Sequence, residues 1–178
     1  NRLKINLKTG EISKRNQNDY FDFECPVNFL GENYKCKNMK KFMNAITLKN
    51  SELRNYLQKI LGMFLTGDIT NRELYIFYGP NGRNGKSTLI GLIQEILTKK
   101  YAKMVDQGVF LKNNSKKFTA GQASPHLMDL IGLRLATFSE PNSNYKLNQN
   151  QIKQLTGDDE VNARGLYQNN ITFKPKCK

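Results

Sequence analysis

The sequence holds 178 residues, enough for one domain of ordinary size with a real hydrophobic core. No apolar run approaches the roughly 18 residues that a membrane-spanning helix needs, so we expect no membrane association through such a helix. The net charge of +13, from 28 basic and 15 acidic residues, favours a polyanionic partner such as nucleic acid. An A/T-rich genome would raise the lysine content in the same way without any role in binding.

The cysteines do not form a metal-binding pattern. Cys25, Cys36 and Cys177 contain no CxxC pair, and the sequence has a single histidine, His126. Structural zinc sites usually show close pairs of ligands, so we expect reduced thiols in an intracellular protein. The chain begins at Asn1 without a methionine or a signal peptide, and we expect it to be part of a longer protein.

Residues 1–37 are rich in extended segments and predict a β-hairpin at the start of the chain. Leu3 and Ile5 alternate with polar residues, residues 8–10 (Lys-Thr-Gly) favour a turn, and an extended segment resumes after it. The aromatic residues at 20–23 follow basic ones. They fit either stacking on nucleic-acid bases or an edge segment that buries its own rings.

The apolar residues between positions 38 and 66 recur at helical spacing and predict two helices. Asn50 and Ser51 lie between the two stripes, where they fit the N-cap of the second helix. We expect both stripes to pack in the core and to have no role in cofactor binding.

An apolar run at residues 74–78 predicts a buried strand that enters a glycine-rich loop and then a helix from about Lys86 to Lys99. Glycine lets backbone N–H groups approach phosphate oxygens closely, and the helix adds the positive end of its dipole. The order strand, glycine loop, Lys-Ser-Thr, helix predicts a phosphate-binding P-loop. The candidate nucleotide-binding residues are Gly79, Pro80, Asn81, Gly82, Arg83, Asn84, Gly85, Lys86, Ser87 and Thr88.

Two side chains of this loop carry the expected chemistry. Lys86 would reach the β- and γ-phosphates of a nucleotide, and the Ser87 hydroxyl would bind Mg²⁺. The spacing departs from the common one, because Pro80 stands where a glycine is usual and Gly79 lies one position earlier. The loop is therefore one residue longer, with Gly82 in its middle. A glycine- and asparagine-rich turn without a ligand is the alternative interpretation.

A second apolar run, at residues 133–138, predicts another buried strand, preceded by a short helix at 126–131. The strand ends at Ser139 and Glu140. Ligands collect at the carboxyl ends of the strands of a parallel sheet, so Glu140 is a candidate catalytic residue. It would activate a water for attack on the γ-phosphate, directly or through bound Mg²⁺. A surface glutamate at a strand end is the alternative.

The C-terminal part predicts a helix and then a basic β-hairpin. Residues 148–156 fit a helix that Gly157 ends. Residues 161–164 and 171–173 fit two strands joined by a turn. The basic side chains of the hairpin are those of Arg164, Lys174 and Lys176.

Three of these segments, taken in order, resemble the superfamily 3 helicases, of the kind found in the poxvirus-type primase–helicases of large DNA viruses and phages. The Walker A loop of that family often carries the Asn-Gly-Lys-Ser core found at residues 84–87, and its Walker B strand ends in a glutamate, as at Glu140. Its third motif matches Lys153, Leu-Thr-Gly at 155–157, Asp159 and Ala-Arg at 163–164. The resemblance covers nearly the whole chain, and the third motif is its most specific part.

The resemblance implies an α/β fold, an AAA+-like P-loop NTPase with a mostly parallel, twisted sheet flanked by helices. Residues 1–67 would be the accessory region, and residues 68–178 the ATPase and helicase core, which stops before the family's sensor motif. Lys86 and Glu140 would be catalytic, and Ser87 and Glu140 would hold Mg²⁺. The hairpin would touch single-stranded DNA, which makes candidate nucleic-acid contacts of Lys153, Arg164 and Lys174.

The implied function is ATP-dependent DNA unwinding during viral or phage-type replication, in the cytoplasm or nucleus of a host cell. ATP and Mg²⁺ would be the cofactors. The implied partners are single-stranded and double-stranded DNA, further copies of the chain in a hexameric ring, and a primase domain in the same polypeptide. No membrane partner is expected.

Two departures from the family pattern keep other functions open. Ser139 stands where many P-loop ATPases have an acid that helps to hold Mg²⁺, and the family's sensor strand is expected just after Lys178. The alternatives are another P-loop NTPase, either a packaging ATPase or a GTPase, and a non-catalytic ATP-binding module that holds an assembly on DNA. The sequence lacks the Asn-Lys-x-Asp pattern that reads guanine, which counts against a GTPase.

Overall fold

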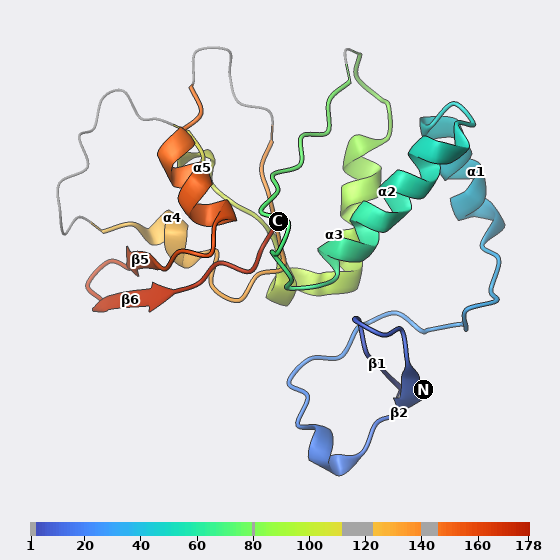
Figure 1. The fold of residues 1–178 in the computed structure, drawn as a ribbon, viewed down its shortest axis with the longest axis horizontal. Coiled ribbons are helices and arrows are strands. Elements are labelled where there is room, and N and C mark those ends of the chain that lie inside the picture. Colours follow the sequence, from blue (N-terminus) through green and yellow to red (C-terminus); the bar gives the residue numbers. More distant parts are fainter. Residues whose placement is uncertain (1–2, 80, 112–122, 140–145) are drawn as a thin grey trace. The chain divides into compact units, whose positions relative to one another are not determined.

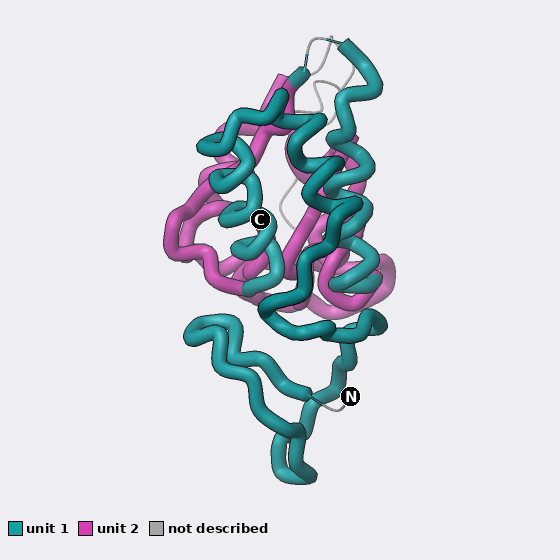
Figure 2. The backbone as a smooth tube through the Cα atoms, turned by 90° about the vertical axis from the view of Figure 1, so that its right-hand side faces the viewer, with its two compact units in different colours: residues 1–66, 79–98 teal, residues 67–78, 99–178 magenta. Residues whose placement is uncertain are grey.

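The computed structural model describes residues 3–79, 81–111, 123–139 and 146–178, and it divides into two compact units (Figures 1 and 2). Unit 1 comprises residues 1–66 and 79–98, and unit 2 comprises residues 67–78 and 99–178. The two units are interleaved along the sequence, because the segment that contains the glycine loop clusters with unit 1. The expected domain boundary at residue 67 stays a prediction.

Unit 1 begins with the expected hairpin. Strand β1 (Leu3–Ile5) pairs with β2 (Ile12–Lys14) in antiparallel register, with Lys4 opposite Ser13. The turn is stabilised locally, because the Asn6 side chain accepts a hydrogen bond from the backbone N–H of Lys8 at 3.0 Å. The single-turn helix η1 (Gln17–Asp19) follows. Its acid is held by Lys4, whose ammonium lies 2.5 Å from Asp19 and, with the backbone bond from Asn16, lowers the pKa of that carboxyl.

Three helices complete unit 1, as the spacing of apolar residues predicted: α1 (Lys37–Ile46), α2 (Ser51–Phe64) and α3 (Lys86–Tyr101). The Asn50 side chain caps α2 by accepting a hydrogen bond from the N–H of Leu53 at 2.9 Å. Helix α3 is interrupted at Thr98, whose φ is 55°, and unit 1 ends at this residue. The buried apolar side chains of the three helices are those of Met43, Ile60, Leu61, Phe64, Leu89, Ile93 and Leu97.

Unit 2 contains a parallel pair of strands and an antiparallel hairpin. Strand β3 (Ala102–Met104) runs parallel to β4 (Leu135–Thr137). The backbone of Lys178 continues this sheet: its N–H donates to the Arg134 carbonyl at 3.1 Å, and its carbonyl accepts from the Ala136 N–H at 2.9 Å. That exchange is the pattern of a parallel pair, so Lys178 lies beside β4 in the same direction. The hairpin consists of β5 (Val161–Arg164) and β6 (Asn170–Phe173).

The structure corrects two expectations about the sheet. Residues 74–78 form no strand, and the side chains of Ile76 and Tyr78 are 74% and 84% exposed, so this apolar run is not a covered central strand. The mostly parallel sheet is also not observed, because only one of the three described strand pairs is parallel. The other two are joined by loops too short for the crossover of a dozen or more residues that a parallel pair requires.

An apolar cluster of described residues organises unit 2. The short helices η2 (Gln107–Val109) and α4 (Pro125–Met128) and the longer α5 (Gln149–Thr156) surround it. Phe110 and Phe138 stack within it, with ring centroids 4.5 Å apart. Its buried members are Val105, Val109, Phe110, Leu130, Leu133, Leu155 and Val161. Because Leu155 and Val161 both belong to it, the cluster holds α5 and the base of the hairpin together. In the described part of the chain, no helix has the length and apolar character that crossing a bilayer requires.

The three cysteines are free, and Cys177 predicts a pH dependence of stability. Burial raises the pKa of the Cys177 thiol from 9.0 to about 11. Between these two values the unfolded chain loses the proton while the folded chain keeps it, so stability falls as the pH rises from about 9 and levels off above 11. The full loss should be roughly 3 kcal/mol.

Urea unfolding at pH 8 and at pH 10.5 checks this prediction. Cys177→Ala should remove that part of the decline, whereas Cys36→Ala, at an exposed position, should keep it. Lysine and tyrosine titrations affect all three proteins alike and cancel in the comparison. Identical pH profiles for the wild type and Cys177→Ala would show that the thiol does not contribute.

Candidate functional site

The glycine loop, residues 79–85, leads directly into helix α3. The Gly85 carbonyl accepts the first helical hydrogen bond, from the N–H of Leu89 at 3.0 Å, so Gly85 is the N-cap of the helix. The N–H groups of Lys86, Ser87 and Thr88 therefore belong to the first turn, where a helix offers donors and the positive end of its dipole to an anion. The side chains of Ser87 and Thr88 are exposed at this end.

One glycine of the loop, Gly85, is required by its conformation and by close approach to a packed helix. Gly85 has φ +81°, and a Cβ added there would lie 2.7 Å from Cγ2 of Ile46 and 3.3 Å from Cε2 of Phe42, both on α1. A Cβ at Gly79 would lie 1.9 Å from Nδ2 of Asn84. Gly82 has no atom within 4 Å of its Cβ position and is not constrained in this way. The chain thus needs glycine at position 85 and not at position 82, whereas a side chain at position 79 would have to displace the flexible side chain of Asn84.

The loop also positions its lysine. The Asn84 side chain donates to the Asn81 carbonyl at 2.9 Å and accepts from Lys86 Nζ at 2.7 Å. Lys86 therefore extends back over the loop, and its ammonium lies 3.1 Å from where a Cβ of Gly79 would be. The sequence predicted Asn84 only as a member of the loop, and its role in holding Lys86 is new. Pro80 lies outside the described residues.

The predicted catalytic strand is present as β4. Because β3 and β4 are parallel, their carboxyl ends lie at the same edge of the sheet. Polar side chains meet there: Gln107 Nε2 donates to Ser139 Oγ at 3.4 Å, and Asp106 accepts from the Gly108 N–H at 2.7 Å, which caps η2. Asp106 was not singled out by sequence reasoning, although it closely follows the run at 102–105.

Glu140, the candidate catalytic and metal-binding residue, lies outside the described residues, so both roles stay predictions. Among the residues that the structure does describe, no cluster of three His, Cys, Asp or Glu side chains could hold a metal ion. The described donor that fits Mg²⁺ beside a phosphate is the hydroxyl of Ser87, exposed at the start of α3. The loop belongs to unit 1 and β4 belongs to unit 2.

The β5–β6 hairpin has a fixed base. Arg164 exchanges two hydrogen bonds with Ser124: its carbonyl accepts from the Ser124 N–H at 2.8 Å, and its N–H donates to Ser124 Oγ at 3.1 Å. Val161 and Ala163 point into the core and are 1% and 2% exposed. The hairpin backbone is therefore positioned by unit 2, while the Arg164 side chain remains half exposed.

The tip of the hairpin carries an aromatic side chain that sequence reasoning missed. Tyr167 is fully exposed, with φ 59°, and Leu166 beside it is 66% exposed. The turn is closed by a hydrogen bond from the Gln168 N–H to the Gly165 carbonyl at 3.3 Å. The sequence carried a signal for this ring, because a tyrosine in the turn of a hairpin is expected to be exposed.

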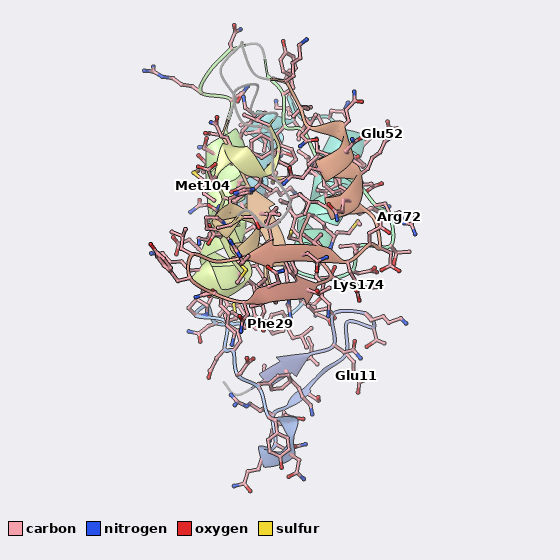
Figure 3. The ribbon with its side chains drawn as sticks, turned by 90° about the vertical axis from the view of Figure 1, so that its left-hand side faces the viewer. Glu11, Phe29, Glu52, Arg72, Met104 and Lys174 are labelled. Carbon is pink, nitrogen blue, oxygen red and sulfur yellow. The ribbon has the colours of Figure 1, made fainter. Side chains whose placement is uncertain are left out.

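The other two predicted nucleic-acid residues lie near the hairpin in the chain. Lys174 directly follows β6 (Figure 3) and forms an exposed ion pair with Asp158 at 3.3 Å. Lys153 is exposed on α5, and its carbonyl accepts the hydrogen bond of the Gly157 N–H at 2.9 Å. A Cβ at Gly157 would lie 2.8 Å from that same carbonyl oxygen, which explains the glycine of the Leu-Thr-Gly segment.

Gly85→Ala should damage both stability and anion binding. The added methyl would overlap Ile46 and hold alanine at a left-handed φ, so we expect a loss of roughly 2 kcal/mol in the free energy of unfolding. A titration with a fluorescent ATP analogue should show at least tenfold weaker binding. Gly82→Ala is the matched control, because its methyl meets open space. Equal stability of the two variants in urea would contradict the close approach to α1.

The chain is similar to proteins of large DNA viruses that are named "Putative helicase". One, from Acanthamoeba polyphaga mimivirus, is 34% identical over 142 residues, which cover 80% of this chain and 14% of the relative. Those of Frog virus 3 and Invertebrate iridescent virus 3 are each 29% identical over 92% of this chain. The matches cover 16% of the Frog virus 3 protein and 17% of the Invertebrate iridescent virus 3 protein. The chain therefore spans about a sixth of the length of these relatives. No protein-family model matches it.

Proposed function

We propose that this chain is the nucleotide-binding part of an ATP-dependent DNA helicase of the superfamily 3 kind, acting in viral or phage-type replication. The observation that carries the proposal is the glycine loop at the start of α3, with Lys86 held over it by Asn84. The viral relatives, whose names describe them as helicases, support a helicase-like role. Known P-loop enzymes use the same combination of backbone donors, lysine and helix N-terminus.

Each loop residue would have a definite task. The N–H groups between Gly79 and Thr88 and the ammonium of Lys86 would bind the phosphates of ATP and balance the negative charge that develops on them during hydrolysis. Ser87 and Glu140 would hold Mg²⁺, which neutralises phosphate charge when bound. Glu140 would orient the attacking water and accept its proton. The side-chain oxygen of Asn84 and the phosphates of ATP would compete for the ammonium of Lys86. Asn84 would therefore release Lys86 when ATP binds.

The hairpin would contact single-stranded DNA. Arg164 and Lys174 supply positive charge, Lys153 lies on the preceding helix, and the exposed ring of Tyr167 offers a stacking surface that accepts any base. A fixed base with an exposed tip suits a lever that carries a DNA strand. By the superfamily 3 resemblance, the active form would be a hexameric ring of identical chains, with a primase domain in the same polypeptide.

A non-catalytic ATP-binding module is the second candidate. The observation in its favour is Ser139, a hydroxyl at the position where an acid commonly supports Mg²⁺. Such a module would bind ATP and DNA without turnover. A packaging ATPase or a GTPase would instead hydrolyse nucleotide. A nucleotide-preference assay identifies a GTPase, because faster turnover of GTP than of ATP argues against a helicase of this kind.

Glu140→Gln in the full-length protein tests the catalytic assignment. The substitution removes the base but keeps the size of the side chain, so ATP hydrolysis should fall by roughly 10²–10⁴-fold while ATP binding stays within a few-fold. Glu95→Gln, on the exposed side of α3, is the control and should leave both unchanged. Unchanged hydrolysis in Glu140→Gln would remove Glu140 from the mechanism, and a wild type that binds but never hydrolyses ATP would favour the module.

Two hairpin variants should affect single-stranded DNA binding in different ways. Arg164→Ala removes one phosphate contact, so the slope of log K against log salt should shrink by about 1. Tyr167→Ala removes stacking, so binding should weaken by roughly 1–3 kcal/mol with the slope unchanged, and Tyr167→Phe should retain it. Tyr56→Ala, at another exposed tyrosine, is the control. Fluorescence anisotropy at salt concentrations from about 50 to about 200 mM distinguishes a change in the salt slope from a loss of affinity at constant slope.

A further inference from the structure

Helix α1 has two opposite faces of different character. Lys37, Lys40, Lys41 and Asn44 follow the spacing i, i+3, i+4, i+7 and so share one face of the helix. The side chains of Phe42, Met43 and Ile46 lie on the other face, where Met43 is buried and the other two approach Gly85. Lys49, just beyond the end of α1, is turned by a φ of 63° and joins the first face. We call Lys37, Lys40, Lys41 and Lys49 the lysine face.

The lysine face lines an open hollow. Its four lysines, together with Asn44 and Ala45, surround a space of about 460 Å³. All four lysines are exposed, and none forms an ion pair with a described carboxylate. A fifth cation is close, because Arg54 Nη1 donates to Asn44 Oδ1 at 2.7 Å. The hollow therefore concentrates positive charge that no ion pair with a described carboxylate offsets.

Helix stability does not account for these lysines. Lys37 and Lys40 lie in the first turn of α1, where the helix dipole disfavours cations. Lys37 and Lys41 are four residues apart, and like charges at this spacing repel by a few tenths of a kcal/mol. The sequence of α1 contains no acidic residue that could offset this repulsion. A polyanion bound along the face would remove the repulsion and the conflict with the dipole together.

The geometry fits a phosphate backbone and not a base or a small anion. From Lys37 to Asn44 the helix rises roughly 10 Å, so the face is longer than one small anion and can extend along more than one phosphate of a strand. Lysine acts as a mobile point charge, suited to phosphates along a chain. No aromatic side chain lines the hollow, so it offers no stacking surface for a base.

We propose that the lysine face of α1 binds the phosphate backbone of nucleic acid without sequence preference. This site goes beyond the hairpin contact of the proposed function. Binding at the lysine face requires neither ATP hydrolysis nor Tyr167, so this proposal does not depend on the chain being a helicase.

A quadruple variant tests the site in the full chain. In Lys37→Gln/Lys40→Gln/Lys41→Gln/Lys49→Gln, the slope of log K against log salt for a fluorescein-labelled thirty-nucleotide oligo(dT) should shrink by roughly 3. Affinity at 0.1 M salt should fall at least tenfold. The matched control, Lys8→Gln/Lys14→Gln/Lys59→Gln/Lys99→Gln, removes the same charge from exposed lysines elsewhere and should change affinity by less than about twofold.

Four further measurements make the outcome decisive. Replacing the same four lysines by arginine keeps the charge and should retain binding, and thermal melting should show that the glutamine variant folds at least as stably as the wild type. Equal losses in the face variant and the control would overturn the proposal, because net charge alone would then explain binding. Loss of binding to phosphatidylserine vesicles without loss of DNA binding would overturn it in favour of a membrane. ATP turnover without DNA should be unchanged, and a wild type without turnover would contradict the proposed function while leaving this site intact.

Discussion

Unit 1 depends on one close approach, that of the Gly85 backbone to α1. Because a side chain at Gly85 would overlap Ile46 and Phe42, the loop can end only with glycine at this point. The left-handed φ of Gly85 turns the chain so that its carbonyl accepts the first bond of α3. The start of α3 then determines which side chains of the helix are buried and where Lys86 leaves the backbone. The packing of α1 and the start of the proposed anion site thus depend on a single residue.

Unit 2 follows a different principle, in which a rigid base supports an exposed end. The base of the β5–β6 hairpin is held by the two hydrogen bonds between Arg164 and Ser124 and by the burial of Val161. The exposed ion pair of Lys174 with Asp158 contributes little to stability, because water screens it. Lys174 is therefore available to exchange a carboxylate for another anion, while the backbone that carries it stays in position.

Local elements could be predicted from the sequence, and non-local ones could not. Both hairpins and the cap at Asn50 depend on residues within a short stretch, so turn residues and alternation were sufficient to find them. Strand β3 was missed because three residues show no period, and its partner β4 lies some thirty positions away. The run at 74–78 was taken for a buried strand because it is apolar, but composition does not report burial, and Ile76 and Tyr78 are exposed.

The same limit applies to the candidate site. The residue types of the glycine loop were readable from the sequence, but the bond from Lys86 to Asn84 depends on how the loop closes. The exposure of Tyr167 and the clustering of Lys49 with the lysines of α1 depend on the positive φ of each residue, which no periodicity predicts. The contacts of the candidate site that depend on backbone conformation are therefore visible only in the structure.

The two-sided character of α1 has a thermodynamic consequence. One face touches the residue that starts α3, and the other carries the unbalanced charge of the lysine face. If the anion proposed for the glycine loop and the polyanion proposed for the lysine face both restrain this helix, linkage requires each to change the affinity of the other by the same factor, without the two ligands touching.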